Sequence, residues 1–544
     1  KDEVIYAKGF GRRNVEEDLP VTSRTLFAIG SSSKAFTTFT LATLVEEGRL
    51  DWDEPVQTYL PDFRLHDEYA STHVTTRDMV SHRTGLPRHD LMWYNNTKVD
   101  RAELVRRLRY LEPNKGLREA WQYNNLMFLT AGSLAGALHG GTWEDAVRAR
   151  VLEPLGMHDV TFSVVESQKT SDYAMPYTVH EEAIERMAFR DISLIGPAGS
   201  INAGVDDMCK WLRVHLDQGR VGDRELVGAA GMSDMHSVQM AMGGIPTDAE
   251  IVTVGYGMGW MIDVYHGHYR VHHGGNIDGF SALVSLLPRD RLGVVVLTNM
   301  NATGLTELVV REVTDRVLDL EDRDWFGEAA MQREQMLAAG KAAEETKQDP
   351  RVAGTTLNHP LEAYAGRYEH PGYGIVTFST DGDHLAVEYN DITAPLEHWH
   401  YEVFSGLENP DDRTFNDMKF SFNHDIQGHL VSVSMQFDPF VDPIVFTRLA
   451  DARLTDPAYL DHFVGRFSIA GQPLRIFRRA NALWAQSPGQ PASELVAAGD
   501  DRFIVKEATM ISFAFRLDEA GVPVMKIVLP NGIFDLVPAA SNAK

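Results

Sequence analysis

The sequence predicts an α+β chain of several domains, in which a mixed helical and strand region is followed by two antiparallel β-barrels. Three observations predict this fold class. An apolar strand runs into a helix near the start of the chain, the composition changes after residue 320, and one pattern recurs 99 residues further on in the C-terminal part. The length of 544 residues also exceeds what one hydrophobic core usually organises, so two or three domains are expected.

The first expected elements are a strand and a helix joined by a turn. Residues 25–30 form the apolar strand, and three serines and a lysine follow it at the turn. The helix after the turn is expected to be amphipathic and to end before Gly48. The expected residues of its buried face are Phe36, Phe39, Leu41, Leu44 and Val45.

Ser31 and Lys34 are three residues apart, a spacing that places both side chains on one face of a helix. Ser32 and Ser33 do not share the face of the lysine, so Ser31 is the candidate nucleophile. A serine hydroxyl needs a base, and a lysine acts as one only when its pKa falls well below about 10.4. Burial and the positive potential of the first helical turn lower it. An ordinary serine N-cap is the alternative interpretation.

Tyr123 and Asn125 form the second candidate element, in the sequence Tyr-Asn-Asn. A tyrosine hydroxyl can carry a proton between Ser31, the leaving group and water. An asparagine two residues later can hold either a substrate amide or the lysine. The alternative is a tyrosine that only packs beside the helix expected to begin near Leu126.

The third candidate element is His273-Gly274-Gly275, followed by Asn276. The glycines allow a strand edge to approach a substrate backbone closely. His273 is expected to face the pocket and to donate to a substrate carboxylate or to the tyrosine. The backbone N–H groups of Asn276 and Ser31 can together form an oxyanion hole. The alternative for the histidine is a hydrogen-bonded, half-buried side chain without a catalytic role.

These three motifs, S-x-x-K, Y-x-N and H-x-G in this order, resemble the class C-like branch of the serine β-lactamase and penicillin-binding-protein superfamily. The tyrosine form is typical of class C β-lactamases, D-aminopeptidases, alkaline D-peptidases and family-VIII carboxylesterases, and the histidine is typical of the peptidase-like members. Residues 75–87 and 196–200 resemble the same branch. The resemblance covers about residues 1–320 and implies a domain, residues 1–323, with an antiparallel sheet and an all-helical subdomain.

The resemblance implies a serine hydrolase that acts through an acyl-enzyme. Ser31 attacks a carbonyl, Lys34 and Tyr123 take its proton, Asn125 orients the acyl amide, and His273 supports the tyrosine or receives a carboxylate. The favoured activity is that of a peptidase or amidase on short or linear peptides. The alternatives are a family-VIII carboxylesterase and a penicillin-recognising binding protein whose acyl-enzyme does not turn over.

The substrate pocket is expected to contain Arg88, His89 and Asp90, together with the Met- and Gly-rich residues 240–256. The expected partner is a small peptide or ester. Neither a cofactor nor a metal is expected, because no H-E-x-x-H motif is present. Histidines two apart on a strand share a face, so a structural metal is the less favoured interpretation of the histidine pairs His266 and His268, His272 and His273, and His398 and His400.

Past residue 320 a charged, alanine-rich helix is expected, and residues 324–359 are interpreted as a helical linker. The segment that begins at Leu361 then recurs at Leu460 with its Gly-Arg-aromatic core, which indicates an internal duplication. Each copy alternates polar and apolar residues in short segments. The first barrel is assigned to residues 360–452 and the second to residues 453–544. The resemblance to D-aminopeptidases implies lipocalin-like barrels of eight strands with one loop over the active site; oligomer contact is the alternative.

Charge and composition narrow the possible partners. Acidic residues outnumber basic residues by 77 to 51, a formal charge of −26, which argues against nucleic acid or an anionic membrane as the main partner. No apolar run approaches the roughly 20 residues that span a bilayer. A homo-oligomer is possible. Cys209 is the single cysteine and is expected to be a small core residue, so no internal disulfide can form.

The N-terminal boundary is a further expectation from the resemblance. Domains of this kind usually begin with a helix and a strand ahead of the position of residues 4–11, so this chain is expected to start inside the first hairpin. Any signal peptide would precede the given sequence. The periplasm and the cytoplasm of a bacterium therefore both stay open as compartments.

Overall fold

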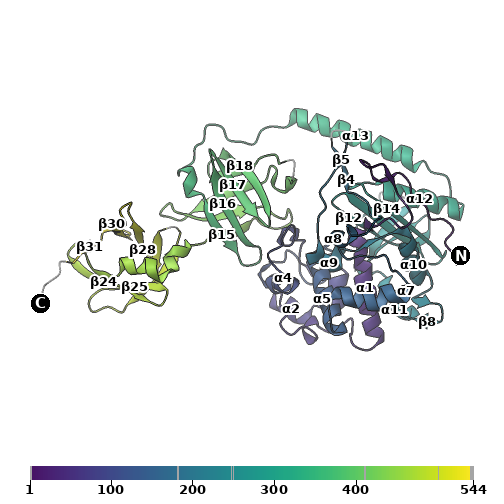
Figure 1. Cartoon of the computed structure of the whole chain (residues 1–544), viewed down its shortest axis with the longest axis horizontal. Coiled ribbons are helices and arrows are strands. Elements are labelled where there is room, and N and C mark those ends of the chain that lie inside the picture. Colours follow the sequence, from purple (N-terminus) through teal and green to yellow (C-terminus); the bar gives the residue numbers. More distant parts are fainter. Residues whose placement is uncertain are drawn as a thin grey trace. The chain divides into compact units, whose positions relative to one another are not determined.

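The computed structural model describes residues 3–180, 183–246, 248, 250–409, 412–499 and 501–539 (Figure 1). Two compact units are present. The first consists of Lys1–Asp349 with the short segment Asp438–Val441, and the second consists of Pro350–Phe437 with Asp442–Lys544. The four-part division expected from the sequence stays a prediction.

The first unit contains a six-stranded antiparallel sheet in the order β14-β13-β12-β11-β10-β9. Its strands are β9 Met240–Ala241, β10 Ile251–Tyr256, β11 Met261–Tyr265, β12 His268–Ile277, β13 Phe280–Leu287 and β14 Leu292–Thr298. Every residue of β13 is buried, because helices α10 (Val205–Leu216) and α12 (Leu305–Leu318) pack against this part of the sheet (Figure 1). The H-x-G motif lies on β12, an inner strand of this sheet, directly after the last residue of β12 that pairs with β11.

Helix α1 (Ser33–Glu46) is buried on nearly all sides, so the expectation of an amphipathic helix is wrong. Its threonines make the sequence look polar, but their hydroxyls are satisfied inside the protein. Thr38 donates to the carbonyl of Lys34 at 3.1 Å, and Thr37 donates to the carbonyl of Pro197 at 2.7 Å. A threonine that bonds to a carbonyl in this way can be buried at little cost. Helix α1 is therefore the central helix of the unit.

Helix α5 (Asn125–His139) packs against α1 and begins at the Y-x-N motif. Asn124 is its N-cap, and the side-chain oxygen of Asn124 accepts the backbone N–H of Met127 at 2.9 Å. The remaining helices of the first unit are α2 Glu68–His73, α3 Thr76–Val80, α4 Arg101–Arg107, α6 Trp143–Val147, α7 Glu153–Leu155, α8 Val164–Ser167, α9 Gly196–Gly199, α11 Ala229–Met235 and α13 Trp325–Thr346.

The strand before the serines is shorter than expected. Only β3 (Phe27–Ala28) is formed, because its partner strand β6 (Asn202–Ala203) offers just two residues for pairing. Residues 3–11, expected to lie in a first hairpin, form no strand and leave large side chains such as Ile5 and Tyr6 exposed. The other short strands form pairs, and their bounds are β1 Arg12–Asn14 with β2 Leu19–Pro20, β4 Tyr177–His180 with β5 Ala183–Arg186, and β7 Arg220–Val221 with β8 Arg224–Glu225.

Cys209 also differs from the expectation. It lies on α10 as expected, but it is half-buried and lines a second cavity together with Leu212 and residues 3–6. Burial and the nearby Asp206 raise the pKa of its thiol. A thiol with a raised pKa is a poor nucleophile, so Cys209 does not compete with Ser31 for that role.

The second unit contains two antiparallel β-barrels, which confirms the fold class expected for the C-terminal part. The first is a closed barrel of eight strands: β15 Gly366–His370, β16 Gly374–Asp381, β17 His384–Tyr389, β18 Ile392–His400, β19 Val403–Gly406, β20 Lys419–His424, β21 Leu430–Met435 and β22 Ile444–Arg448. Its interior is filled with aromatic side chains such as Tyr368, Phe404 and Phe422.

The second barrel is a nine-stranded sheet that nearly closes. Its two outer strands, β30 and β31, are separated along the chain by Leu536 alone. The strands are β23 Gly465–Ile469, β24 Gln472–Arg479, β25 Ala482–Gln486, β26 Ser493–Ala498, β27 Arg502–Val505, β28 Ala508–Leu517, β29 Pro523–Leu529, β30 Gly532–Asp535 and β31 Val537–Pro538. The duplicated Gly-Arg-aromatic pattern occupies the first strand of each barrel, β15 and β23, so the two copies have the same strand order.

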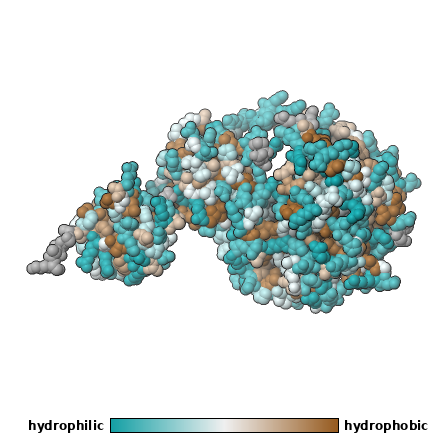
Figure 2. Space-filling view, in the orientation of Figure 1, coloured by the Kyte–Doolittle hydropathy of each residue, from teal (hydrophilic) through white to brown (hydrophobic). Residues whose placement is uncertain are grey.

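On the face visible in Figure 2, hydrophobic residues are scattered among hydrophilic ones. Among the helices of the described residues, none combines the length and the apolar character that crossing a membrane requires.

Candidate active site

Ser31 lies in a short 3₁₀ turn, Gly30–Ser32, that leads directly into α1. Gly30 has a φ of +50°, a conformation that favours glycine. Ser32 is the N-cap of α1, but its side chain makes no capping hydrogen bond and instead donates to the carbonyl of His273 at 3.1 Å. Ser31 therefore precedes the N-cap position, and the sequence alternative of an ordinary N-cap does not describe it.

Lys34 is fully buried and lies against Ser31. Its Nζ is 3.0 Å from Ser31 Oγ, and it donates to Asn125 Oδ1 and to the carbonyl of Ala198, both at 2.8 Å. Burial lowers the pKa of Lys34 well below its ordinary value, and the nearby Arg88 lowers it further. A neutral amine has two N–H donors and one lone pair. The donors fit the two carbonyl oxygens, so the lone pair is left for the Ser31 hydroxyl proton.

The side chain of Tyr123 lies close to Ser31 and beside Lys34, whose Nζ is 4.6 Å from the centre of the tyrosine ring. Burial raises the pKa of the Tyr123 hydroxyl above the ordinary value, although the nearby Ser31 hydroxyl and the charge of Arg88 oppose that shift. The hydroxyl is therefore protonated in the resting site, and it can pass this proton to a strongly basic leaving nitrogen while it receives another. The guanidinium carbon of Arg88 lies 5.2 Å from the centre of the tyrosine ring, and this contact limits the motion of the ring.

His82 holds the Y-x-N segment in place and was not identified from the sequence. Its carbonyl accepts the backbone N–H of Gln122 at 2.8 Å, and its Nδ1 accepts the backbone N–H of Asn124 at 3.1 Å. The residues on both sides of Tyr123 are thus fixed, and the rings of His82 and Tyr123 pack with centroids 4.4 Å apart. The sequence did contain a signal for His82, because this residue lies in the stretch 75–87. That stretch was noted only for its resemblance to the class C-like branch.

His273 does not make the contacts expected from the sequence. Its Nδ1 lies 2.6 Å from the carbonyl oxygen of Gly274, and its Nε2 lies 2.9 Å from the hydroxyl of Tyr256. Because a carbonyl only accepts, Nδ1 carries the proton and Nε2 accepts from Tyr256. Burial lowers the pKa of His273 to about 3, so the ring is neutral. Both nitrogens are engaged, so the ring packs near Tyr123 and donates neither to it nor outward to a substrate carboxylate.

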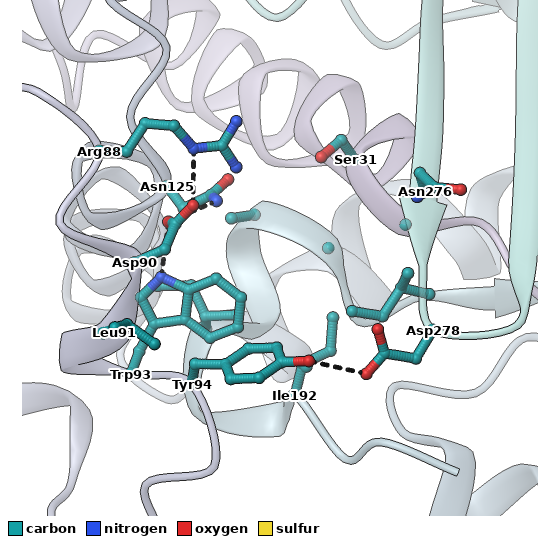
Figure 3. Close-up of a pocket in the computed structure, with 15 residues that line it drawn as sticks. Ser31, Arg88, Asp90, Leu91, Trp93, Tyr94, Asn125, Ile192, Asn276 and Asp278 are labelled. Carbon is teal, nitrogen blue, oxygen red and sulfur yellow. Dashed lines mark hydrogen bonds and ion pairs between the residues drawn. The ribbon is translucent and has the colours of Figure 1, made fainter. Parts of the chain in front are cut away.

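Asn125 holds the lysine rather than a substrate amide. Its Oδ1 accepts from Lys34, and its Nδ2 donates to Asp90 Oδ1 at 3.0 Å (Figure 3). Both ends of the side chain are therefore occupied by the protein itself. Of the two roles that the sequence left open for Asn125, this arrangement matches the second.

A pocket of about 310 Å³ opens beside Ser31 (Figure 3). Arg88 and Asp90 line it as expected, but His89 is buried outside it, and none of the described residues of the segment 240–256 lines it. The sequence did not indicate most of the residues that line the pocket, and the lining comes from five separate segments of the chain. The lining residues are Gly30, Ser31, Arg88, Asp90, Leu91, Trp93, Tyr94, Asn125, Ile192, Ile195, Ala198, Gly199, Asn276, Ile277 and Asp278.

The backbones of the serine turn and of β12 approach each other closely. A Cβ atom on Gly275 would lie 1.8 Å from the carbonyl oxygen of Ile29 and 3.0 Å from the backbone nitrogen of Ser31. A Cβ atom on Gly30 would lie 2.7 Å from the backbone nitrogen of Asn276. Ser31 and Asn276, the two residues expected to form the oxyanion hole, therefore lie on two segments in direct contact. The absence of a side chain at Gly275 therefore allows this contact between two backbone segments, and not only the expected approach of a substrate.

We expect Gly275→Ala to lower the free energy of unfolding of the first unit by about 3 kcal/mol, because the added methyl overlaps the Ile29 carbonyl. Gly274→Ala is the matched control, since a Cβ atom there meets nothing closer than 3.6 Å. Chemical denaturation of the full chain, followed by tryptophan fluorescence, measures both changes. Equal stability of the two variants would show that the close contact at Gly275 does not exist in solution.

The histidine pairs considered for a metal form ion pairs or stacks instead. His272 Nε2 lies 3.1 Å from Asp263, and His268 Nδ1 lies 2.9 Å from Asp290. Within the described ranges, no group of three or more histidine, cysteine or acidic side chains is arranged to hold a metal ion.

Comparison with known proteins identifies relatives of both parts of the chain. The Beta-lactamase family model matches residues 1–315, and that of a domain of unknown function, DUF3471, matches residues 350–448. Unguisins hydrolase ungD' of Aspergillus campestris (strain IBT 28561) is 31% identical over 418 residues, which cover 72% of this chain and 76% of the relative. Unguisins hydrolase ungD of Aspergillus violaceofuscus (strain CBS 115571) is 29% identical over 412 residues, covering 70% and 72%.

One solved structure resembles most of the chain. The octameric penicillin-binding protein homologue from Pyrococcus abyssi superposes with a TM-score of 0.53 at 22% sequence identity. The match covers 82% of this chain and 94% of that chain. At this identity the likeness concerns the fold, and it includes residues beyond the first unit.

Proposed function

Because the chain belongs to the Beta-lactamase family, we propose that it is a serine hydrolase that acts through an acyl-enzyme on an amide bond of a short or linear peptide. The observation that carries this proposal is the buried Lys34, whose Nζ lies 3.0 Å from Ser31 Oγ. Burial favours the neutral amine, and a neutral amine in contact with a serine hydroxyl is the arrangement that activates the serine.

In the first step Ser31 Oγ attacks the carbonyl carbon, and its proton passes to the lone pair of Lys34. The carbonyl oxygen becomes an oxyanion held by the backbone N–H groups of Ser31 and Asn276. Tyr123 then gives its proton to the leaving nitrogen and takes the proton of the Lys34 ammonium, which is the stronger acid of the two. The C–N bond breaks and an ester to Ser31 remains.

Water completes the cycle. Lys34, neutral again in the acyl-enzyme, takes a proton through Tyr123 from the water molecule that attacks the ester, and the resulting Lys34 ammonium returns a proton to Ser31 Oγ as the acid leaves. All three side chains then have their starting protonation states. In this sequence Lys34 is the base, which agrees with its lowered pKa. Tyr123 carries protons between Lys34, the leaving group and water, and its raised pKa keeps its hydroxyl protonated at rest.

A carboxylesterase is the second candidate. The apolar wall of the pocket, which includes Trp93, Ile192 and Ile195, supports it because such a wall suits an apolar acyl group. Charged residues on the same pocket, Arg88, Asp90 and Asp278, instead favour a peptide, since its backbone and termini supply polar partners.

A fluorophosphonate probe and a substrate panel test the proposal. We expect intact-mass spectrometry of the full chain to show one adduct, and peptide mapping to place it on Ser31. The panel contains linear peptides, aminoacyl p-nitroanilides, p-nitrophenyl esters and a chromogenic cephalosporin. Turnover of the amides supports the peptidase, and turnover of esters alone supports the carboxylesterase. A stable adduct with every substrate supports the non-turnover binding protein, and no labelling contradicts all three.

Three expectations from the sequence stay predictions. They are the homo-oligomer, the compartment, and the barrel loop over the active site. The octameric assembly is a property of the Pyrococcus abyssi homologue, and it suggests light scattering of the full chain as the measurement for the first of them.

A further inference from the structure

The Asp90 side chain is held by three hydrogen bonds at the wall of the pocket (Figure 3). Arg88 Nε donates to Oδ2 at 2.6 Å, and Trp93 Nε1 donates to Oδ1 at 2.9 Å. The third donor is Asn125 Nδ2, which lies 3.0 Å from Oδ1. A carboxylate held by three donors from three side chains has a fixed position and a fixed orientation.

The contact with Asp90 determines which end of the Asn125 amide faces Lys34. A carboxylate only accepts hydrogen bonds, so only the Nδ2 end of Asn125 can face Asp90. The Oδ1 end is then turned toward Lys34 Nζ, 2.8 Å away. Turning the amide by 180° would place two oxygens against each other at Asp90 and two N–H donors against each other at a charged Lys34. The observed orientation is therefore the one that Asp90 enforces.

That orientation decides where the lone pair of a neutral Lys34 points. With Asn125 Oδ1 and the Ala198 carbonyl as acceptors, both amine N–H groups are used and the lone pair faces Ser31. If Asn125 presented Nδ2 instead, the lone pair would accept from the amide. It would then be unable to take the Ser31 proton, although no catalytic group had moved.

We propose that Asp90 is a positioning residue, which fixes the Asn125 side-chain amide and thereby directs the lone pair of Lys34 at the Ser31 hydroxyl. This inference rests on the proposed hydrolase function. Asp90 touches neither the nucleophile nor the lysine. It acts through Asn125, and nothing in the S-x-x-K, Y-x-N or H-x-G motifs indicates it.

Asp90 and its partner Arg88 also act on Lys34 through their charges, with opposite signs. The negative charge of Asp90 raises the pKa of Lys34, and the positive charge of Arg88 lowers it. The other titratable groups around the lysine are Tyr123, His82 and His273. Burial keeps these three uncharged near neutral pH, since it raises the pKa of the tyrosine and lowers those of both histidines. The two charged neighbours therefore supply a pH signature that a purely structural role would not produce.

The test is a double-mutant cycle between Asp90→Asn and Asn125→Ala in the full chain, with a p-nitrophenyl ester as substrate. The amide in Asp90→Asn has one acceptor oxygen in place of two, and Arg88, Trp93 and Asn125 compete for it, so the orientation of Asn125 is enforced less strongly. We expect kcat to fall about 10- to 100-fold in each single variant, with a smaller change in KM. In the Asn125→Ala background, Asp90→Asn should lower kcat less than threefold, because the Asn125 amide through which Asp90 acts is absent.

The pH dependence of kcat/KM gives an independent readout. Asp90→Asn should move the acid limb to lower pH, and the matched control Arg88→Gln should move it to higher pH. Additive losses in the cycle, or an acid limb that moves to higher pH in Asp90→Asn, would overturn the proposal. If Asp90→Asn does not fold, Asp90→Glu replaces it, since its carboxylate also only accepts. A kcat within threefold of the wild type supports the proposal, and a loss as large as that of Asn125→Ala overturns it.

The wild-type protein separates this inference from the proposed function. If the probe labels Ser31 and the ester is hydrolysed while the cycle is additive, Asp90 is not a positioning residue and the hydrolase remains. If the wild type is neither labelled nor active, the proposed function itself is wrong, and the inference about Asp90 is wrong with it.

Discussion

Replacing Ser31 with alanine should abolish labelling by a fluorophosphonate and reduce hydrolysis by about 10⁴-fold or more. Without the hydroxyl no acyl-enzyme can form, and the lone pair of Lys34 has no proton to accept. Loss of the probe adduct in intact-mass spectra and loss of turnover in the substrate panel are the two measurements. The first reports the nucleophile, and the second reports the whole reaction.

The neighbouring serines provide matched controls. Ser32 Oγ donates to the carbonyl of His273 at 3.1 Å, and Ser33 Oγ accepts the backbone N–H of Ile201 at 3.1 Å. Alanine at either position should therefore lower the free energy of unfolding by about 1 kcal/mol, while the probe still labels Ser31. Labelling that persists in Ser31→Ala and disappears in Ser32→Ala or Ser33→Ala would show that the nucleophile is misassigned.

The part of the site that the sequence predicts is the part that depends on short spacing. Ser31 and Lys34 lie three residues apart on one turn, so their contact follows from helical geometry. The groups that orient the lysine come from distant segments. The Ala198 carbonyl and Asp90 have no fixed spacing to Lys34, and only the fold brings them there. Motif reasoning therefore finds reacting groups more readily than the residues that hold them.

His273 shows a second limit of prediction from the sequence, which concerns its hydrogen-bond partners. Its place on a strand near the nucleophile follows from the H-x-G motif, but its bonding depends on Tyr256, 17 residues earlier on β10. The pairing of β10 with β11 and of β11 with β12 sets that distance, and no local pattern gives it. The expectation that His273 donates to a substrate carboxylate or to the tyrosine was wrong, because Tyr256 on β10, two strands away, and the Gly274 carbonyl engage both ring nitrogens.

In the fold, as in the site, some features follow from a pattern in the sequence and others do not. The duplicated barrels were recognisable because an alternating pattern recurs at a fixed offset. The burial of α1 was not recognisable from the sequence, because the threonines of this helix suggest an exposed face. The threonine hydroxyls instead donate to buried carbonyls. Thr40 Oγ1, for example, donates to the carbonyl of Phe36 at 2.8 Å. Polarity in a sequence therefore indicates exposure only where the polar group lacks a partner in the protein.

Replacing Lys34 should have the second large effect. We expect Lys34→Met to reduce kcat by about 10³-fold at neutral pH, because no other group near Ser31 is both neutral and basic there. In the wild type, kcat/KM should rise with pH as Lys34 loses its proton. Since burial lowers the pKa of Lys34, the midpoint of this rise should lie well below 10.4. A pH profile with the ester substrate measures it.

Lys34→Arg distinguishes between two possible roles of Lys34, that of a base and that of a fixed positive charge. A guanidinium keeps the charge of a lysine but does not lose its proton in the accessible pH range, so it cannot take the Ser31 proton. We therefore expect Lys34→Arg to be as inactive as Lys34→Met, with melting temperatures that show both variants to be folded. Lys34→Arg activity within tenfold of the wild type would mean that the charge is what matters. The wild-type profile decides the same question without a variant, because a lysine that acts as a cation would make kcat/KM fall, rather than rise, as pH passes through its pKa.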